Sequence, residues 1–208
     1  KSITEPSPNV SFWLLIGQMR LFLFSMVVGA PYRLAMTGFI VYLMPVHLKD
    51  SGLTLTMIGQ MLTAYHIVNW LTVAPIAQWV DKHQRYVSGT VFSIVAMAGA
   101  LVLFSSFLGT PWVLWLSVIL LSVAMNVNTS VQIPMIPSTL AKECATFGQK
   151  NVVAYFKTME RVASVVGPLF CAALYYHYGA SSPIYLGGLL LLIGLGAGVF
   201  FRVKKQVP

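Results

Sequence analysis

Six long apolar segments, separated by short polar connectors, constrain this chain more than any other feature of its sequence. A helix needs about 20 largely apolar residues to cross the hydrocarbon core of a bilayer, and each segment is close to that length or longer. The short connectors require neighbouring helices to run antiparallel, so the sequence predicts an all-α membrane protein. The six predicted spans cover residues 12–46, 55–80, 86–108, 112–136, 148–178 and 183–201.

The composition argues against a soluble protein. Hydrophobic residues make up 57% of the 208 residues and charged residues only 9%, whereas a soluble domain usually carries about 25% charged residues. Two cysteines, Cys144 and Cys171, do not have the spacing of a metal site or a disulfide framework. The sequence also lacks an ATP-binding loop and a nucleophile–base pair. We therefore expect no enzyme, no metal and no cofactor.

The basic residues predict the orientation in the membrane. Lysines and arginines account for a net charge of +8, and they lie between the apolar segments rather than in a stripe that would bind nucleic acid. Residues 81–85, residues 141–150 and the chain end hold them on one side, whereas the opposite connectors hold only Lys49. The positive-inside rule predicts a multi-pass protein of the plasma (cytoplasmic or inner) membrane with both termini in the cytoplasm. Residues 1–11 are expected to be a polar lead-in or linker, and residues 204–208 a cytoplasmic tail.

Polar residues enter only some of the predicted spans. Because such residues are costly inside a bilayer, their positions are informative. Spans one, two, four and five contain them, and spans three and six do not, so the pattern repeats every three spans. Two three-helix units related by inverted topology would produce this repeat. The intramembrane charges, amides and imidazole are Arg33, His66, Asn69, Asn126, Asn128, Gln132, Lys157, Glu160 and Arg161.

Residues 75–86 resemble the loop signature of the major facilitator superfamily, G-x-x-x-D-[RK]-x-G-[RK]-[RK]. Asp81, Lys82 and Arg85 occupy its charged positions. Ala77 and Gln84 stand where the two glycines belong, and Tyr86 replaces the last basic residue.

A second element lies in span five. Ala163, Gly167, Pro168, Cys171 and Ala172 resemble the G-x-x-x-G-P-x-x-G-G element of the fifth helix of a half, with a small residue at every small position. Residues 38–45, followed by two further glycines, also look like the opening of such a half. The resemblance covers nearly the whole chain.

The superfamily has twelve spans in two halves, so the resemblance implies that this chain is one half and that a second six-helix half is its partner. That half would come from the same gene, a separate chain or a second copy. The absence of an arginine in span four and the short tail favour the C-terminal half, whereas the fifth-helix element is more typical of N-terminal halves of antiporters. The resemblance also implies that Asp81, Lys82 and Arg85 form a cytoplasmic gate loop.

Arg33 is the strongest candidate for function. An unpaired guanidinium near the middle of a span costs several kcal/mol or more, so it requires a partner or water. Glu160 lies at a similar depth in span five and is the predicted partner, with Lys157 and Arg161 beside it. The group would anchor an anionic substrate, form a mobile ion pair or exchange a proton. The alternative is a static cluster that locks helix packing.

The remaining candidates are polar residues of spans two and four and a bend in span five. His66 and Asn69 share a helix face and would line a cavity or relay a proton, although a buried, satisfied histidine is the alternative. Asn128 and Gln132, four residues apart, would bind a polar solute or bond neighbouring helices. The last two candidates, Gly167 and Pro168, should bend span five because proline lacks a backbone N–H.

Together these features predict a secondary transporter, or half of one, for a small polar or anionic solute. A cavity would be lined by spans one, two, four and five. Because there is no ATP-binding loop, energy would come from a gradient of protons or Na⁺, or from the solute itself. The alternative is a transporter-like sensor or receptor module, or a non-transporting subunit of a membrane complex.

Overall fold

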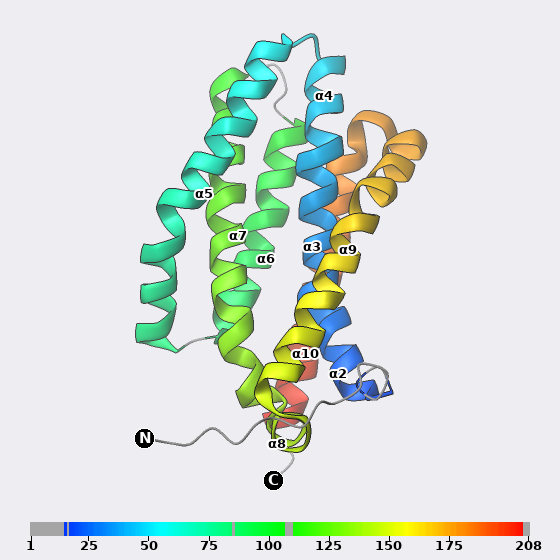
Figure 1. The fold of residues 1–208 in the computed structure, drawn as a ribbon. Helices are drawn as coiled ribbons and strands as arrows, with labels where there is room; N and C mark the ends of the chain where they lie inside the picture. Colours follow the sequence, from blue (N-terminus) through cyan, green and yellow to red (C-terminus); the bar gives the residue numbers. More distant parts are fainter. Residues whose placement is uncertain (1–14, 16, 85, 107–109, 206–208) are drawn as a thin grey trace.

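The computed structural model describes residue 15 and residues 17–84, 86–106 and 110–205. All regular elements of these residues are helices (Figure 1). In chain order they are α2 (Met19–Phe24), the π-helix η1 (Ser25–Gly29), α3 (Ala30–Gly38), the π-helix η2 (Phe39–Leu43), α4 (Met44–Asp50), α5 (Leu55–His83), α6 (Tyr86–Ser106), α7 (Pro111–Thr139), α8 (Ala141–Phe147), α9 (Gln149–Tyr178), the 3₁₀-helix η3 (Gly179–Ser181) and α10 (Ser182–Lys205).

Six long helical stretches occupy the regions where the sequence predicts spans, but some of their ends differ from the prediction. The first stretch, α2 to α4, continues four residues past the expected end at residue 46, and residues 12–14 lie outside the described part. Helix α5 runs to His83, so Asp81 and Lys82 lie in its last turn rather than in a loop. The expected connector at residues 141–150 contains a short helix, α8.

Four stretches of the described chain are long and apolar enough to cross a membrane. They are Met19–Asp50, Tyr86–Ser106, Pro111–Thr139 and Gln149–Gly196, and the last of these contains both α9 and the first part of α10. Helix α5 is not among them, because its glutamine, histidine and asparagine residues lower its hydropathy. The prediction of a multi-span helical membrane protein is confirmed, whereas the number of six crossings stays a prediction.

The end of α5 adopts a backbone conformation that favours glycine. Gln84 caps the helix with φ 50° and ψ 24°, in the left-handed region, and its N–H donates to the carbonyl of Val80. The other described residues with positive φ are glycines: Gly52, Gly148 and Gly179. Gln84 stands at a glycine position of the loop signature, so the local geometry explains why a glycine suits that position.

Replacing Gln84 by glycine is expected to raise the free energy of unfolding by about 0.5–1 kcal/mol, because a side chain in the left-handed region costs roughly 1–2 kcal/mol. Thermal unfolding of the purified protein in detergent measures the change. Gln84→Ala is the control, because alanine keeps the strained Cβ. Equal stability of the glycine and alanine variants would contradict this explanation.

The long helices pack in defined pairs. Helix α3 packs along α9, α5 packs along α7, and α6 lies between α7 and α10 (Figure 1). The end of α5, helix α8 and the end of α10 lie at one end of the bundle, and the turn between α4 and α5 lies at the other. The basic residues of α5 and α8 are therefore at the same end, as the charge pattern requires.

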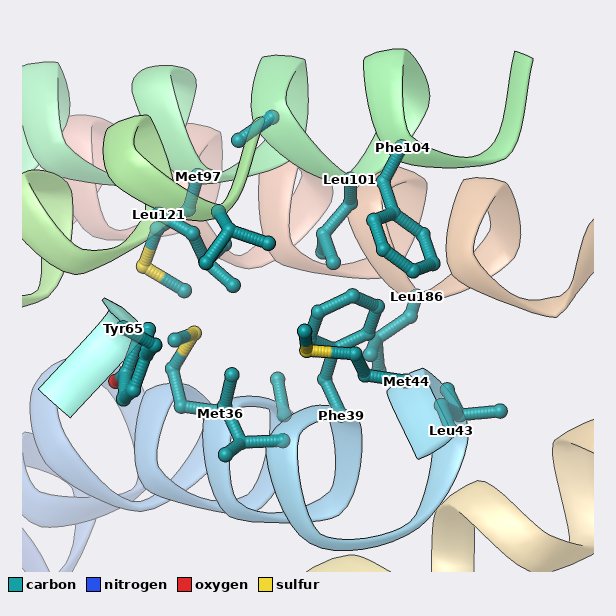
Figure 2. Close-up of a cluster of buried hydrophobic side chains, with 14 of the residues drawn as sticks. Met36, Phe39, Leu43, Met44, Tyr65, Met97, Leu101, Phe104, Leu121 and Leu186 are labelled. Carbon is teal, nitrogen blue, oxygen red and sulfur yellow. The ribbon is translucent and has the colours of Figure 1, made fainter. Parts of the chain in front are cut away.

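A large apolar core joins the first helical stretch to α6 and its neighbours. Figure 2 shows side chains of the first stretch pointing toward those of α6 and α7. The Phe39 and Phe104 rings meet edge to face, with centroids 5.0 Å apart. The core holds α6 against the helical stretch that carries Arg33. Its labelled members are Met36, Phe39, Leu43, Met44, Tyr65, Met97, Leu101, Phe104, Leu121 and Leu186.

A second apolar core lies at the end of the bundle that contains α8. It joins residues of α2 and η1 to the end of α7 and the start of α9, including Phe24 and Phe156. An ion pair between Arg20 Nη1 and Glu143 Oε1, 3.6 Å apart, links α2 to α8 across this core. The connector between α7 and α9 is therefore packed against the first helix.

Candidate functional site

A buried carboxylate lies between two cations at the contact of α3 and α9. Glu160 is 2% exposed. Its Oε2 accepts a hydrogen bond from Lys157 Nζ at 2.5 Å, and its Oε1 lies 3.6 Å from Arg33 Nε. The structure therefore brings together Arg33, Lys157 and Glu160, which the sequence predicts at similar depth. The fourth predicted member, Arg161, is exposed and forms no ion pair with any described residue.

The backbone beside Glu160 is shaped to admit its side chain. Gly29, the last residue of η1, faces it: a β-carbon there would lie 2.6 Å from the Phe156 ring and 3.2 Å from Glu160 Cγ. The Arg33-bearing helix α3 is also bounded by π-helical turns on both sides, η1 and η2. Such turns are rare and occur frequently at functional sites.

The charges of this group do not balance. Two cations face one carboxylate, and the exposed Arg161 adds a third positive charge nearby. The Arg33 and Lys157 side chains keep 30% and 33% exposure, whereas the Glu160 side chain keeps 3%. The cationic side chains are therefore partly accessible, while the carboxylate is covered.

Two tyrosines that the sequence reasoning missed lie near this group. Tyr32 adjoins Arg33 in α3, and Tyr65 of α5 belongs to the same buried core as Tyr32. The Tyr32 hydroxyl is buried, and no described residue hydrogen-bonds to it. Tyr65 donates to the sulfur of Met125 at 2.6 Å. A tyrosine next to an intramembrane arginine was the available signal, but its side-chain direction depends on how the helices pack.

Asn128 and Gln132 of α7 lie elsewhere, and both are fully buried. Asn128 Nδ2 donates to Ser93 Oγ of α6 at 3.0 Å. Gln132 Nε2 donates to Asn128 Oδ1 at 2.6 Å and to the carbonyl of Val28 at 3.4 Å. These bonds tie α7 to α6 and to the first stretch, so the geometry favours hydrogen bonding between helices over solute binding for this pair.

Asn126 joins α5 to α7 and was absent from the predicted site. Its Nδ2 donates to the carbonyl of Asn69 and to Thr72 Oγ1, both at 2.7 Å. Ser122, one turn earlier, donates to the carbonyl of Tyr65 at 3.0 Å. These three bonds hold α5 against α7, although few side chains of α5 are buried.

Asn126→Ala is expected to lower the free energy of unfolding by about 1 kcal/mol, because interhelical bonds in membranes average about 0.6 kcal/mol each. Denaturant unfolding in detergent measures the loss. The matched control is Asn69→Ala, which keeps the accepting backbone carbonyl and should change stability little. A larger loss in the control than in Asn126→Ala would contradict this assignment.

His66 and Asn69 share the α5 face as expected, but they do not join the Arg33 group. His66 is exposed, with its ring 5.1 Å from the Tyr65 ring, and Asn69 is half-buried. Asp81 and Lys82 are exposed at the end of α5 and form no ion pair with any described residue, while Arg85 lies outside the described residues. The cavity and gate-loop roles of these residues stay predictions.

Gly167 lies where α3 and α9 approach each other closely. A β-carbon on Gly167 would overlap the carbonyl oxygen of Leu34, and one on Gly38 would overlap the carbonyl of Gly167 and the Cys171 sulfur. Helix α9 continues through Pro168 without a break, and Pro168 is half-buried. The structure thus gives Gly167 a role in helix packing, whereas the sequence predicted only a bend at this position.

A family model described as Major Facilitator Superfamily matches residues 13–208. The chain belongs to the major facilitator superfamily. This match confirms the resemblance drawn from the two motifs. Members of this superfamily are membrane transporters rather than enzymes. No curated protein and no solved structure matches the chain. The matched length fits one half of a major facilitator.

The fifth-helix element of the superfamily has a steric explanation in this chain. Ala163, Gly167 and Cys171 recur every four residues along α9 and are buried, and the last two face the backbone of α3 at Gly38. Small side chains allow this close approach, as they do in other membrane helix pairs. The element therefore positions α9, and with it Glu160, against the helix that carries Arg33.

Proposed function

We propose that this chain is a secondary active transporter, or half of one, that moves a small polar or anionic solute by alternating access. The observation that carries the proposal is the buried Glu160 between Arg33 and Lys157. A buried carboxylate that holds two partly exposed cations is suited to exchange one partner for a solute anion or for a proton. Intramembrane ionisable residues of this kind mark substrate and ion pathways in many transporters.

The pairing of the helices supports two inverted three-helix repeats. If the first stretch corresponds to α7, α5 to α9 and α6 to α10, then the α3–α9 pair corresponds to the α7–α5 pair. The α6–α10 pair corresponds to itself. All three pairs are extensive contacts, whereas the α6–α7 contact is not matched by an equally extensive contact of α10 with the first stretch. The symmetry of an inverted repeat maps one helix pair onto another in this way, and such repeats are common in transporters.

The π-helical turns around α3 support a moving Arg33. A π turn accommodates one extra residue in a helix, so a shift at η1 or η2 would rotate the intervening segment. Such a rotation would change the distance between Arg33 and Glu160 while the helix stays intact. Small helix shifts of this type occur in switching transitions.

Helix α5 supports a second six-helix half as partner. Among the described elements α7 alone covers it extensively, yet α5 is less apolar than a lipid-facing span and exposes His66, Ile67 and Trp70. An open helix that mixes polar and large apolar side chains in this way suits contact with another protein surface beside a water-filled cavity. We favour the C-terminal half for this chain, and the partner half comes from the same gene, a separate chain or a second copy.

The coupling ion in this proposal is a proton or Na⁺, with Glu160 as the exchanging carboxylate. His66 and Asn69 line the pathway, Asn128 and Gln132 hold the helices around it through their interhelical hydrogen bonds, and Asp81, Lys82 and Arg85 act as the cytoplasmic gate loop. The protein resides in the plasma (cytoplasmic or inner) membrane, and both termini are cytoplasmic.

Single cysteines test the topology. Lys82→Cys and Lys205→Cys should react with an impermeant maleimide from the same side of the membrane, and Lys49→Cys from the other side. Background labelling is low because Cys171 is fully buried. Burial, together with the Glu143 carboxylate, raises the pKa of the Cys144 thiol, so its thiolate is scarce at neutral pH. Labelling of positions 82 and 205 from opposite sides would contradict the topology.

The direct test is solute binding followed by uptake. A set of carboxylates, phosphate and uncharged polar solutes is screened for thermal stabilisation of the purified full-length protein, and each hit is then measured as radiolabelled uptake into proteoliposomes with and without a proton or Na⁺ gradient. Gradient-driven uptake of an anion is the expected result. Binding without uptake would instead support the sensor or receptor alternative.

A further inference from the structure

An apolar groove of about 310 Å³ lies between the first helical stretch, α9 and α10. Ala30 and Leu34 of α3 form its floor together with Ala163 of α9, and Val166 and Leu189 face it from α9 and α10. All of the side chains that line it are apolar. The proposed ion pathway does not use this groove, although Ala163 of the fifth-helix element forms part of its floor.

The groove exists because α10 packs against α6 rather than against α9. Two glycines of α10 allow this contact: a β-carbon on Gly194 would lie 2.7 Å from Ile94 Cγ2, and one on Gly187 would lie 3.3 Å from the carbonyl oxygen of Ala98. Contacts of α10 with α9 and α3 are sparse by comparison. The small side chains of Ala30 and Ala163 leave the gap between α9 and α10 open.

The groove and the charged group lie on opposite sides of α9. Lys157 and Val166 are nine residues apart, and at about 100° per residue they point in opposite directions. Gly167 and Glu160 lie between these two faces and contact α3. A solute at Arg33 and Lys157 is therefore separated from the groove by the tightly packed α3–α9 contact.

We propose that this groove binds one acyl chain of a membrane lipid. Four stretches of the chain are apolar enough to span a bilayer, and the exposed rim residues Val162 (54%) and Leu189 (37%) are aliphatic. A lipid chain is the apolar molecule that the bilayer supplies to such a face. An empty apolar gap forfeits dispersion contacts, and a chain restores them.

The shape and charge of the groove distinguish this occupant from others. A groove of about 310 Å³ can hold a single acyl chain but not a whole helix of a second copy, which is about 10–12 Å in diameter with its side chains. Because no charged side chain lines the groove, binding should depend on the chain and not on the headgroup. The inference does not depend on the proposed transport activity.

The test compares two tryptophan substitutions on α9. Val166→Trp fills the groove, whereas Val165→Trp is the matched control, because Val165 is 74% exposed and lies outside the lining. The purified full-length protein is stripped with detergent and incubated with vesicles of dioleoyl phosphatidylcholine or dioleoyl phosphatidylglycerol. Retained lipid is then counted by mass spectrometry of the intact protein, and melting curves establish which variants are folded.

Wild type and Val165→Trp are expected to retain one phospholipid of either kind, and Val166→Trp at least tenfold less. Ile193→Trp fills the groove from α10, with Leu192→Trp as its control, in case Val166→Trp does not fold. Equal retention by the filled and control variants would overturn the proposal. Retention of phosphatidylglycerol alone would also overturn it. So would a lipid-free dimer of the protein that forms in wild type and is lost when the groove is filled.

Discussion

Gly167→Val is expected to lower the free energy of unfolding by about 3 kcal/mol or more, a larger loss than for the other stability changes predicted above. A β-carbon at Gly167 overlaps the carbonyl oxygen of Leu34. Because that atom belongs to the backbone, it cannot rotate away as a side chain would, and the two helices must separate along their length. Overpacking of flexible side chains alone typically costs 1–3 kcal/mol.

Melting temperature in detergent measures the change, and a loss of about 3 kcal/mol corresponds to roughly 6–12 °C for a chain of this size. Gly188→Val is the matched control: it makes the same change within a helix, at a position where no atom lies within 4 Å of the added carbon. If the two variants melted together, the close α3–α9 contact would not be a determinant of stability.

The second large effect is expected on transport. Arg33→Leu and Glu160→Leu should each lower uptake of the identified solute at least a hundredfold, because each removes a charge from the pathway. Arg33→Leu should cost about 1–2 kcal/mol of stability, less than the 3–5 kcal/mol typical of a broken buried pair. Lys157 stays 2.5 Å from the carboxylate, and Arg33 is partly exposed.

The double variant, Arg33→Leu with Glu160→Leu, separates function from packing. It should be about as stable as Arg33→Leu, because removing the buried carboxylate leaves only the partly exposed Lys157 without its partner, and it should remain inactive in uptake. Lys142→Leu, an exposed cation in α8, is the control that should retain uptake. Recovery of uptake in the double variant would show that the Arg33–Glu160 pair is a static lock.

The prediction of the Arg33–Glu160 pair from the sequence rested on depth. A helix rises about 1.5 Å per residue, so the position of a residue within its span sets its height in the membrane. Polarity that repeats every three spans, and two motifs with small or charged residues at fixed positions, were likewise readable from the sequence. The family match over residues 13–208 confirms the family that these motifs indicated.

The sequence was less informative about the direction in which each side chain points around its helix axis. Asn126, Asn128 and Gln132 are equally polar in sequence, but Asn126 bonds α5 while Asn128 and Gln132 bond α6 and the first stretch. His66 shares the α5 face with Asn69 but does not join the Arg33 group, and its place in a cavity stays a prediction. Which neighbour a helix face meets depends on the packing of all six stretches.

The six apolar segments determined by themselves that this chain is a helical membrane protein, because segments of such length and apolarity have no other stable environment. They also determined the depth of each charge, because the helical rise is constant. Only the tertiary structure decided that Glu160 is covered while its cations stay open, and that Gly167 meets the α3 backbone. Burial and close approach depend on the rotation and crossing of neighbouring helices, which short-range sequence pattern does not specify.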